Sequence, residues 1–126
     1  MSPELLVMGG QRVLVCPAQG SVLCGEADAL DLIGLAMAQG AGWVAAPVER
    51  LGNDFFRLES RVAGEMIQKF VNYRVRLAIV GDLSAPLARS GALRDFVHES
   101  NKGRHVWFVE DMQALAARLA EASDGD

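Results

Sequence analysis

The sequence predicts a single α/β domain with a mainly parallel five-stranded sheet and four helices, in the order ββαβαβαβα. Short apolar runs alternate along the chain with longer segments whose apolar residues recur every three or four positions, as in strands and amphipathic helices. A Gly-Gly turn joins the first two runs and predicts an antiparallel hairpin. Strands that alternate with helices predict right-handed crossovers and a parallel sheet. We therefore expect the first strand to be an antiparallel edge strand.

The first two strands are predicted at residues 5–8 and 12–16, with the turn at residues 9–11 between them. The first helix is predicted at residues 26–39, where Asp28 lies in the first turn and favours the positive end of the helix dipole. This helix is apolar around most of its girth, which requires cover on both sides. We expect its outer surface to form an apolar patch, unless the hairpin and the last helix cover it.

The middle of the chain predicts a short buried strand at residues 43–46 and then a long helix over residues 53–72. Asn53 or Asp54 is expected to cap this helix, because short polar side chains accept hydrogen bonds from free backbone N–H groups. Asn72 is expected to close it in a left-handed conformation.

The last third of the chain predicts a buried strand at residues 75–80 and a third helix that Ser90 caps and that ends near residues 101–103. The fifth strand is predicted at residues 106–109, and Asp111 is expected to cap the last helix. The domain spans residues 1–122 in this interpretation, and residues 123–126 form a frayed polar tail.

Composition excludes several classes of function. The formal charge of −4 with no basic run gives no field that attracts nucleic acid. No apolar stretch reaches the roughly 20 residues of a membrane span, and a signal peptide is not evident. Cys16 and Cys24 lack the partners of a zinc site, so we interpret both as buried thiols in a reducing compartment. These observations predict a cytoplasmic protein that binds no metal, cofactor, nucleic acid or membrane.

Several multi-residue motifs occur in one order: DALDLI at residues 28–33, AGEMIQKF at 63–70 with NYR at 72–74, GD at 81–82, and LRDF at 93–96 with ESNKG at 99–103. The chain resembles the bacterial domain-of-unknown-function family 4180 over residues 13–119. The resemblance implies a bacterial protein and leaves its chemistry open.

The order of elements is also similar to that of STAS domains, the modules of sulfate transporters and anti-sigma-factor antagonists. That resemblance implies a regulatory interaction domain. In antagonist-type STAS domains, a phosphorylatable Ser or Thr lies where the third strand meets the second helix. Here residues 51–56 carry no hydroxyl group, and the first one is Ser60, so the resemblance does not extend to this switch.

Two groups of polar residues are candidate sites, one at each edge of the sheet. Parallel strands bind ligands beyond their carboxyl ends, where we place Asn53, Asp54, Asp82 and Ser84. These residues either bind a ligand or partner, or cap helices and make a turn. At the opposite edge we place Tyr73, Arg74, Glu99 and Asn101. This second group forms either a polar docking patch, with Arg74 pairing with Glu99, or ordinary helix caps.

The leading functional hypothesis is a non-catalytic regulatory or protein-interaction module, either a homodimer or bound to an unidentified protein, with the first helix and residues 53–56 as contact surfaces. The alternative is a sensor that binds a small ligand at the carboxyl ends of strands three and four. The third hypothesis is an enzyme, with Glu65, Asp82 or His98 as acid or base by residue type alone.

Overall fold

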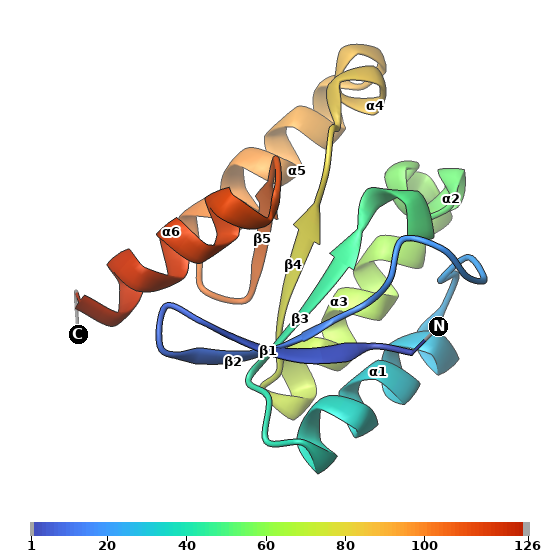
Figure 1. The fold of residues 1–126 in the computed structure, drawn as a ribbon. Helices are drawn as coiled ribbons and strands as arrows, with labels where there is room; N and C mark the ends of the chain where they lie inside the picture. The colour runs from blue at the N-terminus through green and yellow to red at the C-terminus, as the bar shows by residue number, and fades with distance from the viewer. Residues whose placement is uncertain (1, 125–126) are drawn as a thin grey trace.

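The computed structural model describes residues 2–124 and confirms the predicted α/β class (Figure 1). The strands are β1 (Glu4–Met8), β2 (Gln11–Val15), β3 (Trp43–Pro47), β4 (Arg76–Val80) and β5 (Val106–Val109). The long helices are α1 (Glu26–Ala38), α3 (Val62–Tyr73), α5 (Gly91–Lys102) and α6 (Met112–Asp124). The connections contain two shorter helices, α2 (Asn53–Phe56) and α4 (Ser84–Arg89), and the 3-10 turns Val48–Arg50 and Leu58–Ser60.

The sheet has the strand order β1-β2-β3-β4-β5. The hairpin is antiparallel, with Leu6 opposite Val13, and the other pairs are parallel, with Val44 opposite Leu77. Gly9 and Gly10 both have positive φ, which glycine adopts without a steric penalty and which the tight turn requires. The predicted antiparallel edge strand is therefore confirmed as β1.

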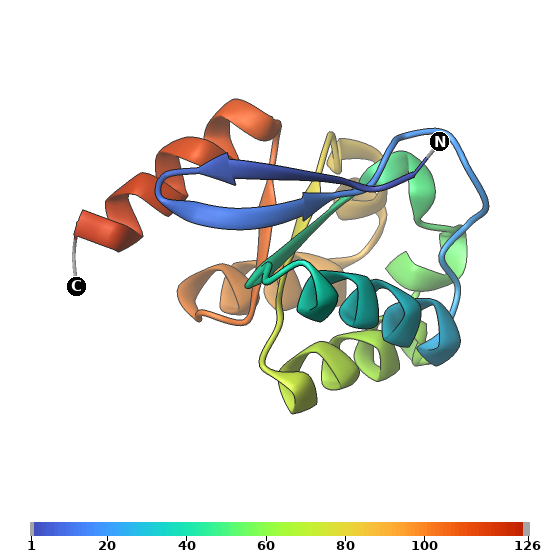
Figure 2. The ribbon, with the colours of Figure 1, turned by 60° about the horizontal axis from the view of Figure 1, so that its bottom comes forward.

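The two faces of the sheet carry different helices. The crossovers from β2 to β5 advance in one direction, so connections of one hand place α1, α3 and α5 on the same face. Their apolar residues pack with the strand residues Leu14, Val44 and Ile79. Among the described helices only α6 covers the opposite face, where Leu115 and Leu119 lie in a second core with Trp43. Figure 2 shows α6 across the sheet from α1 and α3.

The prediction of one continuous helix over residues 53–72 is wrong. The structure divides this segment into α2, the turn Leu58–Ser60 and α3. Arg57 has an extended backbone and Arg61 a left-handed one, with φ 68°. Two interruptions of the helical backbone therefore separate α2 from α3.

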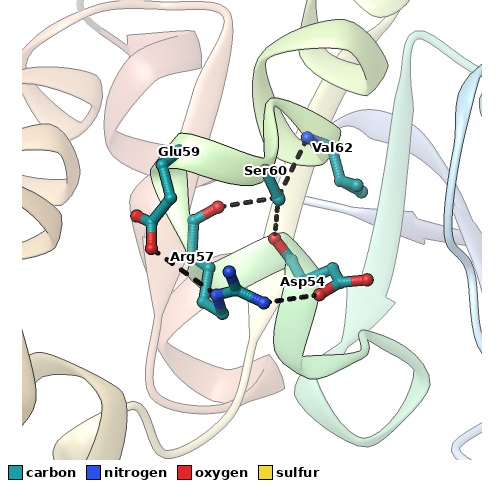
Figure 3. A network of polar contacts seen from close by, with 5 residues as sticks. All are labelled: Asp54, Arg57, Glu59, Ser60 and Val62. Atoms are coloured by element: carbon teal, nitrogen blue, oxygen red, sulfur yellow. Dashed lines mark hydrogen bonds and ion pairs between the residues drawn. The ribbon is translucent and has the colours of Figure 1, made fainter.

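The Ser60 hydroxyl holds this interruption together (Figure 3). It donates toward the carbonyl oxygens of Asp54 and Arg57, and it accepts from the backbone N of Val62 at 3.3 Å. One side chain thus replaces backbone hydrogen bonds that the interruption removes.

The helix ends differ from the prediction in detail. Gly52 precedes α2 and no side chain caps that helix, so the predicted cap by Asn53 or Asp54 is wrong. Arg74, with φ 60°, takes the left-handed position predicted for Asn72. The caps predicted for the last two helices are confirmed: Ser90 accepts from the backbone N of Leu93, and Asp111 from that of Ala114.

The C-terminal boundary also differs from the prediction. α6 continues to Asp124, two residues into the segment predicted as a tail, and residues 125–126 lie outside the described residues. None of the helices within the described chain is long and apolar enough to span a membrane.

Candidate functional site

The carboxyl ends of β4 and β5 surround a hollow of about 410 Å³, which we call the Asp82 hollow. Figure 1 shows α4 just beyond the end of β4, and α5 runs back beside β5. The lining residues come from both strand ends and both helices: Gly81, Asp82, Leu83, Ser84, Leu87, Val97, Phe108, Val109 and Glu110. The hollow therefore has an apolar interior formed by helix and strand side chains, with polar groups at the strand ends.

Asp82 and Ser84 form the turn between β4 and α4. One carboxylate oxygen of Asp82, Oδ1, accepts from the Ser84 backbone N at 2.8 Å and also from the Ser84 hydroxyl. These bonds, the hydroxyl first and the backbone N–H second, hold the pKa of Asp82 below its ordinary value of 3.8. Asp82 is thus ionised at neutral pH, and it places a negative charge at the mouth of the hollow.

A second hollow at the same edge, about 660 Å³, lies between the β3–α3 connection and α4, and we call it the Asn53 hollow. Asn53, Phe56 and Arg57 line one side of it, and Pro86 and Arg89 of α4 line the other. α4 therefore borders both hollows.

The structure brings only part of the predicted carboxyl-edge group together. Asp82 and Ser84 share a hydrogen bond and line the Asp82 hollow. Asn53 lines the other hollow, and Asp54 forms an exposed ion pair with Arg57 at 3.3 Å.

The predicted amino-edge group is also not assembled around one point. Asn101 bonds to β5, with its Oδ1 accepting from the backbone N of Phe108 at 2.7 Å. Glu99 pairs with Lys102 on its own helix at 3.2 Å, rather than with Arg74. Tyr73 is exposed at the end of α3. No hydrogen bond or ion pair joins the side chains of this group to one another in the described chain, so nothing supports the interpretation of the group as one docking patch.

The amino edge has a different hollow, about 160 Å³, lined by Gln11, Trp43, Arg76, Arg104, Trp107, Leu119 and Ala122. The Trp43 and Trp107 rings lie 4.5 Å apart, centroid to centroid. The guanidinium of Arg118 lies 3.9 Å above the Trp107 ring. The two rings are tilted by 43° and pack in the α6 core.

The outer face of α1 carries three exposed large apolar residues, but they do not form one continuous patch, because exposed Asp31 lies between Leu30 and Leu35 around the helix. Leu30, Leu35 and Met37 are 39%, 42% and 57% exposed. The inner face packs through Leu32 and Ile33, which are buried. Residues 2–124 therefore leave the apolar residues on the outer face of α1 uncovered, with Leu30 and Met37 on one flank and Leu35 on the other.

Sequence reasoning missed the apolar walls of the Asp82 hollow, and the candidate group did not include Glu110, although the strand order predicts its place at this edge. Glu110 follows β5 directly, so strand order alone places it at this edge. Strand order does not predict that Leu87 and Val97 line the hollow, because this depends on the position of α4, and the sequence shows no periodicity that predicts α4.

The sequence matches the family described as Domain of unknown function (DUF4180) over residues 8–119. The chain belongs to this family. The DUF4180 match begins at the end of β1 and extends into α6, so it includes both carboxyl-edge hollows and α1. No curated protein and no solved structure matches the chain. Within residues 2–124, no three His, Cys, Asp or Glu side chains are grouped so that they could hold a metal ion.

Proposed function

We propose that the chain is a protein-interaction domain that associates with a second copy of itself through the outer face of α1. The observation that carries this proposal is the exposure of Leu30 and Met37, which lie on one flank of the helix together with Gly34. Apolar surface that is left exposed on a helix marks interfaces in many proteins. Burial of these side chains against a partner would remove their apolar area from water and stabilise the complex.

The centre of this face favours a second helix as the occupant. Leu30, Gly34 and Met37 follow each other at i, i+4 and i+7 and therefore lie in one line along the helix. A Cβ atom at Gly34 would meet nothing within 4 Å, so the surface is open there. Two copies crossing at Gly34 could bring their backbones close together while the larger side chains interdigitate on either side.

The charges around α1 favour an antiparallel pair. The acidic residues Glu26, Asp28 and Asp31 all lie in its first half; Glu26 already pairs with Lys69 and Asp28 accepts from the backbone N of Cys24, so Asp31 is the free charge. At the other end, the Arg12 guanidinium lies beside Gly40, 3.8 Å from the position of a Cβ there. Two-fold symmetry about Gly34 would place the acidic half of each copy next to Arg12 of the other, so the surface is complementary to itself.

The roles of the polar side chains support the same proposal. Asp82 forms a turn, Asn101 bonds to β5 and Ser90 caps α5, so these groups already have structural tasks. The similarity of the element order to that of STAS domains supports an interaction role, and a bacterial, cytoplasmic origin stays part of the prediction.

Native mass spectrometry and sedimentation of the full chain test the proposal. We expect a dimer, and we expect Met37→Lys to convert it to a monomer because the new charge would be buried in the interface. The matched control is Ala117→Lys, which places the same charge on the exposed face of α6. A wild-type monomer at about 100 µM, where weak specific dimers still form, would refute the proposal. Equal effects of the two lysines would refute the assignment to α1.

A further inference from the structure

We propose that the Asp82 hollow binds a small primary amine with an apolar body, such as an arylalkylamine. This inference is independent of the association through α1, because the hollow lies at the carboxyl edge of β4 and β5. Ligands of α/β sheets bind at this edge. The volume of about 410 Å³ lies within the range of roughly 300–1,000 Å³ that small-molecule sites occupy.

The interior of the hollow explains the apolar body. Leu87 of α4, Val97 of α5 and Phe108 of β5 supply its walls. Leu87 and Val97 are only half-buried, so part of their apolar surface remains in contact with water. A hydrocarbon group that filled the hollow would remove this surface from water, which is the main source of affinity in such sites.

The carboxylates that follow β4 and β5 are the reason for proposing an amine group in the ligand. The backbone N of Gly81 donates to the carbonyl oxygen of Val109 at 2.9 Å, so the residues that follow, Asp82 and Glu110, leave neighbouring strands side by side. The Asp82 oxygen that bonds Ser84 is Oδ1, and no described residue bonds Oδ2. The Glu110 carboxylate likewise has no partner among residues 2–124.

These two carboxylates select the charge of the ligand. No Lys, Arg or His is among the residues that line the hollow, and the Arg94 guanidinium that lies near it donates to the main-chain carbonyl of Leu87 rather than to Asp82 or Glu110. Opposite charge attracts an ammonium group and repels a carboxylate or phosphate. A metal ion fits less well, because the described residues bring no third ligand of the His, Cys, Asp or Glu type to this place.

The test titrates the ¹⁵N-labelled full chain with 2-phenylethylamine and follows backbone amide shifts by NMR. We expect saturable shifts at the amides of Gly81, Asp82, Ser84 and Glu110, with a dissociation constant in the millimolar range or tighter. The matched probe 3-phenylpropionate has the same apolar body and the opposite charge, and we expect no saturable shifts with it. High salt should weaken binding of the amine, because both carboxylates are exposed to solvent.

Variants locate the site. Glu110→Gln removes one charge and breaks no contact in the described chain, so we expect about threefold weaker binding in a folded protein, as for one exposed ion pair. Leu87→Trp should abolish binding by filling the hollow. The control Glu99→Gln removes a carboxylate of α5 that does not line the hollow and should leave binding unchanged.

Three results would overturn the inference. The first is the lack of saturable shifts with up to about 10 mM amine, because even a modest specific site binds its ligand with a dissociation constant below this concentration. The second is equal binding of 3-phenylpropionate, which would show that charge does not select the ligand. The third is binding that Glu110→Gln and Leu87→Trp leave unchanged. Because the oligomeric state is measured separately, none of these results bears on the association through α1.

Discussion

The two cysteine side chains lie in different surroundings. Cys16 follows β2 and is buried in the core under α1, α3 and α5, and burial raises the pKa of its thiol to about 11, although the nearby Arg50 charge opposes this shift. Cys24 lies in the loop before α1 and is exposed, which corrects the expectation that both thiols are buried. A free Cys16 thiol is thus protonated and shielded at neutral pH, while Cys24 is accessible.

This contrast predicts the number of reactive thiols. At pH 8, the native chain should react with 5,5′-dithiobis(2-nitrobenzoate) at one thiol, and the chain unfolded in guanidinium should react at two. Cys24→Ser should leave no rapidly reacting thiol in the native state. Rapid modification of both thiols in the folded wild type would contradict the assignment of Cys16 to the core.

The same pKa shift gives the sign of a pH effect on stability. The folded-state pKa of Cys16, about 11, exceeds the ordinary value of 9.0, so the native state favours the protonated thiol. The contribution is complete below pH 9 and is lost as the pH rises from 9 towards 11, because the unfolded chain ionises first.

At the scale of elements, the interruption between α2 and α3 depends on Ser60. We predict that Ser60→Ala lowers the free energy of unfolding by about 1 kcal/mol, because the change removes the hydroxyl contacts to Asp54, Arg57 and Val62. Urea denaturation followed by circular dichroism measures this loss. The neighbouring variant Asn53→Ala is the control, since Asn53 is exposed and its side chain does not cap α2. A Ser60→Ala protein as stable as wild type would contradict this role for the hydroxyl.

Short apolar runs predicted the five strands, because the central ones are buried on both faces, and periodicity predicted the long helices, because burial repeats along them every three or four residues. It could not reveal the interruption, because Phe55, Leu58, Val62 and Met66 keep helical spacing on both sides of it. The preference of Ser for helix starts was the only local signal. α4 has six residues, which is less than two turns, and it contains Pro86, so no period could form.

The same distinction explains what could be predicted of the candidate site. Asp82 and Ser84 were placed correctly at the carboxyl edge because parallel strands end on the same side. Which side chains meet there depends on α4, which divides the edge into the Asp82 hollow and the Asn53 hollow.

At the scale of the whole molecule, Asn101 closes the second edge of the sheet. β5 pairs with β4 on one side, and its other side would leave the backbone N–H and C=O of Phe108 unpaired. Asn101 of α5 bonds both groups, accepting from the N–H at 2.7 Å and donating to the C=O at 3.3 Å. Arg118 of α6 donates to the main-chain carbonyl of Asn101 and also lies over Trp107. Asn101 of α5 therefore forms hydrogen bonds with both β5 and α6, which links the helices on the two faces of the sheet.

We predict that Asn101→Ala destabilises the chain by about 1–3 kcal/mol, because it leaves polar backbone groups of a buried residue without partners. Equilibrium denaturation measures the loss, and Glu99→Ala is the control, since it breaks only an exposed ion pair with Lys102 and should cost no more than about 0.5 kcal/mol. The freed edge of β5 should also increase aggregation on heating, because an unpaired strand edge can add a strand from another chain. Full stability of Asn101→Ala would show that the residue is not structural, and a role in docking would then become the better explanation of its place at the amino edge.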